Sequence, residues 1–144
     1  MRGVFALAVA AVVLAGGASA HTQLGSLGAA ASATDSYQVT CSDDGSGPPK
    51  TLLLQVQDTT SASAPLVGVE GHRASQNSNS VDATSGDSNP SPLVYVNGGS
   101  GVFDVLVYKI GAGADSYTLT YHCYTGVNGT GIHTGTAIVR GQNQ

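Results

Sequence analysis

The segment SYTLTYHCY, residues 116–124, decides the fold class of this chain. Its large residues alternate with smaller polar ones, so that every second side chain lies on the same side of an extended backbone. Leu119 and Cys123 then share an inner face, and His122 lies on the outer one. Similar strand signals, without helical periodicity, recur in 37–41, 51–57, 65–71, 92–96, 102–110 and 136–140. Seven strands joined by glycine-rich turns predict an all-β protein, an antiparallel β-sandwich.

The connections between these segments predict some of their pairings. The stretch NGGSG, residues 97–101, separates two strand-like segments and is typical of a hairpin turn. Asn128-Gly129 favours a two-residue turn in the last hairpin, which places His133 opposite Tyr124. The polar stretch 73–92 predicts a long loop with room for one short irregular strand.

The first twenty residues have the features of a secretory signal peptide. Arg2 supplies the positive charge, 4–14 is an apolar run, and Ala18-Ser19-Ala20 is a small-residue cleavage site of bacterial style. The apolar run is shorter than the roughly 20 residues that a membrane span needs. We therefore expect residues 1–20 to be removed, the mature chain to begin at His21, and the protein to be exported to the periplasm or the medium without a membrane span.

The rest of the chain divides into two parts. Residues 21–34 show neither strand alternation nor helix caps, and their glycines predict a flexible N-terminal arm. Residues 35–144 carry the strand signals and form the predicted β-sandwich domain.

The two cysteines, Cys41 and Cys123, predict a disulfide bond. Each follows an echo of the same pattern, DSYQVT at 35–40 and DSYTLT at 115–120, at an even spacing from the aspartate. An even spacing keeps both thiols on the core face of their strands. The alternative is a pair of buried free thiols. The Tyr121-His122-Cys123 run also resembles the Tyr-x-Cys of immunoglobulin domains, which implies an immunoglobulin-like sandwich architecture and nothing about function.

Charge and missing motifs exclude several function classes. Five Lys and Arg, one of them Arg2 in the leader, face nine Asp and Glu, which leaves no basic surface for nucleic acid. The sequence also lacks the nucleophile, zinc-protease and phosphate-loop motifs of common enzymes. We therefore expect a protein that is not an enzyme and does not bind nucleic acid.

Three histidines are candidates for a metal site. In the predicted last hairpin His133 lies diagonal to His122 on the outer face, with Cα atoms about 7–8 Å apart. His21 would add both a ring and a free amine, and it resembles the histidine brace of periplasmic copper carriers and lytic polysaccharide monooxygenases, which begin with histidine. Such nitrogen ligands suit copper or zinc. The alternative is that these histidines are ordinary solvated surface, as we expect for His72.

Two further features bear on ligands. The only methionine, Met1, belongs to the leader, so a thioether-rich Cu(I) site is excluded. The loop segments 42–45 and 82–87 offer oxygen ligands for calcium, but turn formation by Asp and Ser is the favoured explanation for them.

Two functions therefore remain. The sequence favours an exported, non-enzymatic module that binds an unknown protein or surface partner, or that serves display or structure, without a certain cofactor. The alternative is a small secreted copper or zinc protein that uses His21, the His122–His133 pair, or all three.

Overall fold

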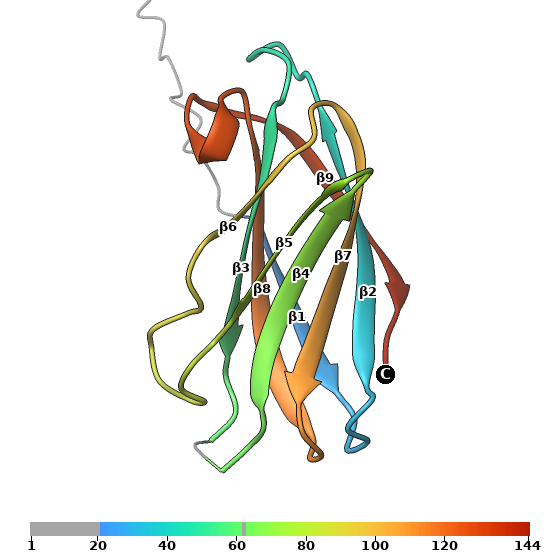
Figure 1. Ribbon diagram of the computed structural model, residues 1–144, viewed down its shortest axis with the longest axis vertical. Coiled ribbons are helices and arrows are strands. Elements are labelled where there is room, and N and C mark those ends of the chain that lie inside the picture. The colour runs from blue at the N-terminus through green and yellow to red at the C-terminus, as the bar shows by residue number, and fades with distance from the viewer. Residues whose placement is uncertain (1–20, 62) are drawn as a thin grey trace, which may run out of the picture.

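The computed structural model describes residues 21–61 and 63–144 (Figure 1). The predicted signal peptide, residues 1–20, lies outside the described residues. The described chain is all-β and antiparallel, with nine strands and one short 3-10 turn, η1 (Val127–Gly129). The strands are β1 (His21–Leu27), β2 (Thr34–Ser42), β3 (Thr51–Asp58), β4 (Leu66–Arg73), β5 (Gln76–Val81), β6 (Val94–Asn97), β7 (Gly101–Ile110), β8 (Asp115–Tyr124) and β9 (His133–Gln142).

The strands form two layers that are joined along one edge. One layer has the order β6-β3-β8-β1 and the other β5-β4-β7-β2-β9. β9 pairs with β2 along most of its length and with β8 at only two positions, Cys123 with Thr134 and Tyr124 with His133. The result is a nearly closed antiparallel sheet, in which β4 and β7 lie in front of β8 and β1 in Figure 1. The predicted fold class is confirmed.

The core lies between the two layers and follows the alternation of the sequence. Tyr37, Phe103 and Tyr117 are its largest fully buried side chains, and inward-facing Val and Leu residues of β2, β3, β4, β7 and β8 fill the space around them. Each fully buried side chain of this size contributes roughly 1.5–3 kcal/mol through removal of apolar surface from water.

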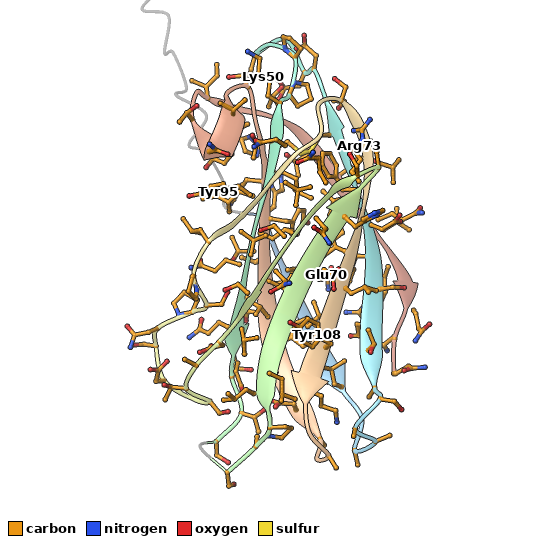
Figure 2. All side chains as sticks on the ribbon, in the orientation of Figure 1. Lys50, Glu70, Arg73, Tyr95 and Tyr108 are labelled. Atoms are coloured by element: carbon orange, nitrogen blue, oxygen red, sulfur yellow. A yellow bond between two sulfur atoms is a disulfide. The ribbon has the colours of Figure 1, made fainter. Side chains whose placement is uncertain are left out.

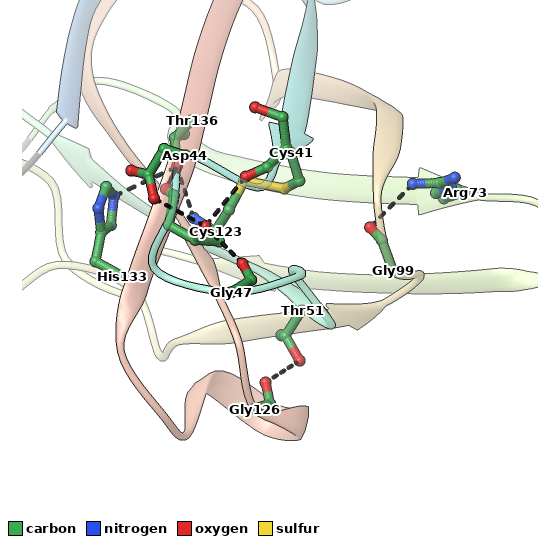
Figure 3. The surroundings of a disulfide bond; sticks show 12 residues. Cys41, Asp44, Gly47, Thr51, Arg73, Gly99, Cys123, Gly126, His133 and Thr136 are labelled. Carbon is green, nitrogen blue, oxygen red and sulfur yellow. Dashed lines mark hydrogen bonds between the residues drawn. A yellow bond between two sulfur atoms is a disulfide. The ribbon is translucent and has the colours of Figure 1, made fainter.

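The disulfide between Cys41 and Cys123 is confirmed. It joins the end of β2 in one layer to the end of β8 in the other, with Cα atoms 5.6 Å apart, and both cysteines are buried (Figure 3). The bridge closes a loop with a sequence separation of 82 residues. It therefore holds the two layers together at the end of the fold where β8 meets β9.

The prediction of a flexible arm is wrong for its first half. Residues His21–Leu27 form β1, which pairs with β8 over seven residues. Gly25, which favoured flexibility in the sequence, lies against the ring of Tyr117 on β8, and a Cβ at this position would overlap that ring. Leu27 is buried in the core. The glycine therefore permits close packing here, and the alternation of β1 is weak because only its last residue is an apolar core residue.

One connection agrees with the sequence and one differs from its prediction. β5 forms a hairpin with β4 inside the polar stretch, as the one short strand that the sequence allowed. β6 and β7 do not pair with each other, because β6 pairs with β3 and β7 pairs with β2 and β4. NGGSG therefore crosses from one layer to the other. Arg73, at the end of β4 in Figure 2, stabilises this crossing: it donates to the Gly99 carbonyl at 3.0 Å and its guanidinium lies 5.0 Å from the centre of the Phe103 ring.

The last hairpin has the predicted turn. Asn128 and Gly129 both have positive φ, 53° and 71°, and Thr130 N–H donates to the Val127 carbonyl at 3.2 Å. These are the features of the two-residue turn that Asn-Gly favours. In the described part of the chain, no helix is long and apolar enough to cross a membrane.

Candidate metal centre

The strands β1 and β9 both reach the C-terminal half of β8, where the three histidines come together. One edge of β8 pairs with β1 up to Tyr121 and with β9 from Cys123 onward. His122 lies at the changeover between the two neighbours. His21 begins β1 opposite Tyr121, and His133 begins β9 opposite Tyr124. His21 and His133, the first residues of β1 and β9, therefore both lie next to His122.

The three imidazoles form a compact cluster. One ring nitrogen from each of His21, His122 and His133 lies within 4.8 Å of the other two. The ring centres are 5.6 Å apart for His21 and His122, 5.0 Å for His21 and His133, and 5.2 Å for His122 and His133. Nitrogens at about 2.0–2.1 Å from one zinc ion lie about 3–3.5 Å from each other. The three side chains could hold a metal ion if the rings turn to bring these nitrogens closer together.

Two ring nitrogens of the cluster lack a hydrogen-bond partner. The Nδ1 atoms of His21 and His122 are buried and accept or donate no hydrogen bond. Only His133 has a polar contact, between its Nε2 and the Thr136 hydroxyl at 3.3 Å. A buried polar atom without a partner costs about 1–3 kcal/mol. A bound metal ion removes this cost, because a nitrogen lone pair that faces no donor is free to coordinate.

The surroundings of His122 and His133 favour their neutral forms. Burial, and then the proximity of His133 and His21, lowers the pKa of His122 to about 4. Burial, and then His21, also lowers the pKa of His133, while Asp44 opposes that shift. Neutral imidazole is the form that binds metal. Asp44, held by the Ser46 N–H at 3.0 Å, adds a negative charge near His133 that favours a cation.

Aromatic and apolar residues enclose the histidines. The Tyr121 ring stacks on His21 with ring centres 5.6 Å apart. The Tyr124 ring packs edge to face with His122 and His133, with ring centres 6.1 and 6.2 Å apart. Leu53, opposite His122 in the β3–β8 pair, is also buried. These neighbours explain why His122 is only 9% exposed although it lies on the outer face of its sheet.

Thr136 connects the cluster to the disulfide. Its hydroxyl accepts the Cys123 N–H at 3.0 Å, donates to the Thr134 carbonyl at 2.9 Å, and contacts the His133 ring (Figure 3). Ring orientation at a metal site depends on such partners. The sequence shows no signal for this role of Thr136, and it offered Asp44 only within the 42–45 segment, as a turn residue or a calcium ligand.

The structure separates the remaining candidates from this site. His72 lies on β4 in the other layer, opposite Asp104, and is exposed, as expected. The loop aspartates stabilise turns: Asp43 accepts from Gly45 N–H at 2.8 Å and Gly47 N–H at 3.0 Å, and Asp87 accepts from Asn89 N–H at 2.8 Å. Their side chains therefore serve the turn chemistry that the sequence offered as the alternative to calcium.

Comparison with known proteins gives no relative. No protein-family model, no curated protein and no solved structure matches this chain.

Proposed function

We propose that this protein binds one transition-metal ion, Cu(II) in first place, through His21, His122 and His133. The observation that carries the proposal is the approach of three ring nitrogens to within 4.8 Å, two of the residues having a buried Nδ1 without a hydrogen-bond partner. The three donors come from the starts of β1 and β9 and from the end of β8, so they lie together only in the folded protein. This distinguishes the cluster from scattered surface histidines.

The donor chemistry supports copper over other ions. Imidazole nitrogen suits Cu(II) and Zn(II), and Cu(II) binds more tightly than the other divalent ions of its row at a given site. Both cysteines are in the disulfide, so no thiolate competes as a ligand. The only methionine is Met1. Zinc is the second candidate ion, because three histidines also make an open zinc site.

Removal of the proposed signal peptide would complete the donor set. Cleavage after Ala20 frees the amine of His21, and this amine and the Nδ1 of the same residue close a six-membered ring on a metal ion. Nδ1 is the ring nitrogen of His21 that is buried and unpartnered. Four nitrogens would then be available, in an arrangement similar to a histidine brace.

The protein would act as an exported metal-binding module and not as an enzyme. The disulfide agrees with an oxidising compartment, the periplasm or the medium. Binding of a protein or surface partner is a second candidate function, supported by Val102, Leu106 and Ile110, which are exposed on β7.

Calorimetric titration of Cu(II) into metal-free protein from an exporting host tests the proposal. We expect one equivalent to bind, and the double variant His122→Ala/His133→Ala to bind at least roughly 100-fold more weakly, since each lost ligand contact costs more than one tenfold step. An N-terminal histidine alone holds some copper, so weak residual binding is expected in the variant. His72→Ala is the matched control and keeps the parent affinity. Equal affinities for the parent and the double variant would show that His122 and His133 do not bind the metal.

A further inference from the structure

Two buried carboxyl groups lie at the other end of β8 from the histidines. Asp115 is the first residue of β8 and is 3% exposed, and Asp58 is the last residue of β3 and is fully buried. The seven steps along the strand from Asp115 to His122 span about 23 Å of extended chain. The pair is therefore separate from the proposed copper site.

The pairing of β3 with β8 brings the two side chains together. Asp58 lies opposite Tyr117, and Asp115 is two residues before Tyr117 on the same, inward face. Diagonal neighbours on one face of an antiparallel pair are within reach of each other's side chains. Burial raises the pKa of Asp115, the Thr60 hydroxyl and the Ser116 N–H oppose that shift, and the hydrogen bond and negative charge of Asp58 raise the pKa further.

Each carboxyl group has one oxygen bound and one oxygen without a partner. Thr60 N–H donates to Oδ1 of Asp58 at 3.0 Å, and Ser116 N–H donates to Oδ1 of Asp115 at 2.8 Å. Both Oδ2 atoms are buried and have no hydrogen-bond partner. A third carboxylate lies close by, since Oδ2 of Asp82 accepts the N–H of Asp58 at 2.8 Å. Neighbouring buried carboxylates cannot all stay ionised without a compensating positive charge.

We propose that Asp58 and Asp115 hold a calcium ion through their Oδ2 atoms. Carboxylate oxygens are the ligands that calcium prefers, and its six to eight ligands tolerate an irregular arrangement. The Thr60 hydroxyl, which accepts the Ser116 N–H at 2.7 Å, lies beside the pair as a further oxygen.

An open pocket gives the ion access and room for water. It has a volume of about 430 Å³, and Thr60, Asp115 and Ser116 line it together with residues 26–28, Ala114 and the last two residues of the chain. Asp115 borders the pocket and Asp58 does not, and water molecules in the pocket would complete the coordination of the ion. A site that keeps several water ligands binds calcium weakly, in the range of about 0.1–1 mM that is typical of extracellular modules.

Thermal unfolding with increasing calcium, after treatment with a chelator, tests this site. We expect the melting temperature of the parent protein to rise with calcium, with half of the effect between about 0.1 and 1 mM. Asp115→Asn should lose the response, because the amide carries no charge and offers only one oxygen. Asp104→Asn, at an exposed position on β7, is the matched control and should respond like the parent. The double variant His122→Ala/His133→Ala should also respond, which separates this test from that of the copper site.

The competing explanation is a single proton shared between the two carboxyl groups. It predicts no change of melting temperature with calcium at any concentration up to tenfold above the expected range. It also predicts that the parent gains stability relative to Asp115→Asn as the pH falls toward the range where carboxyl groups titrate, a comparison in which the contribution of the histidines cancels. That pair of results would overturn the calcium proposal. If Asp115→Asn does not fold, Asp58→Asn takes its place, and the titration of the parent decides the matter in either case.

Discussion

The ring of His21 lies 5.0 Å from the ring of His133, centre to centre, and the two planes are inclined by only 24°. These residues begin the first and the ninth strand, and the two strands do not pair with each other. They meet because β1 and β9 occupy successive parts of one edge of β8. The proposed metal site would therefore depend on how firmly β1 is held against β8.

Gly25→Ala should weaken Cu(II) binding without changing a ligand. A Cβ at this position overlaps the Tyr117 ring, so β1 must shift away from β8 and carry His21 with it. Loss of such positioning at metal sites typically costs 10- to 100-fold in affinity, and we expect a loss of roughly this size by titration calorimetry. Gly28→Ala is the control, because its Cβ would have ordinary contacts at 3.6 Å with Gln144. An unchanged affinity in Gly25→Ala would show that His21 is not a ligand.

One extra residue before His21 should also weaken Cu(II) binding. The added peptide bond converts the amine of His21 into an amide and removes it as a donor, whereas the ring stays in place. We expect a loss of at least roughly tenfold in affinity, equivalent to about 1.4 kcal/mol. Competition with a copper chelator measures the difference. The same affinity with and without the extra residue would leave a site of three imidazoles only.

Protein recovered from an exporting host should begin at His21. Small residues at Ala18 and Ala20 satisfy the requirement of signal peptidase. N-terminal sequencing or intact mass determines the first residue. A chain that retains residues 1–20 would contradict both the export and the amine ligand, but not the cluster of three rings.

The metal-free protein should lose stability as the pH falls from 6.5 toward 4. The pKa of His122 is about 4 in the folded protein, against about 6.5 for an unperturbed histidine, so the unfolded chain takes up a proton first as the pH drops. The contribution of neutral His122 to the free energy of unfolding is therefore full above pH 6.5. It decreases below that pH, by about 2 kcal/mol at pH 4.5. Urea unfolding at pH 7.5 and 4.5 measures this change. His122→Gln, which does not titrate, should show a smaller difference between the two pH values than the parent, and parallel behaviour of the two proteins would refute the assignment to His122.

Replacing both cysteines, as Cys41→Ala/Cys123→Ala, should lower the free energy of unfolding by about 4 kcal/mol, because the bridge closes a loop with a sequence separation of 82 residues. Denaturant unfolding of the variant and the oxidised parent gives the difference. Copper affinity should fall as well, since Cys123 adjoins His122 and the β8–β9 pair comprises only two positions there. A loss of stability below about 1 kcal/mol would mean that other contacts hold the two layers together.

Local periodicity determined much of this fold. Side chains of an extended chain alternate between two faces, so residues 116–124 and the segments like them revealed the core faces, and the same alternation placed Cys41 and Cys123 where they form the bridge. Asn128-Gly129 specified the register that sets His133 opposite Tyr124, because both residues adopt the positive φ that the turn requires.

Only the tertiary structure decided the rest. Whether residues 21–27 pair with β8 depends on a free edge far along the chain and on the fit of Gly25 against Tyr117, neither of which is visible in the local pattern. Without that pairing, His21 is a terminal residue with no partner in sight. The sequence likewise placed His122 on an outer face, but its burial comes from neighbours on other strands. The pairing of distant strands depends on the backbone hydrogen bonds along all strand edges of the folded chain. The histidine cluster and the Asp58–Asp115 pair both result from such pairing.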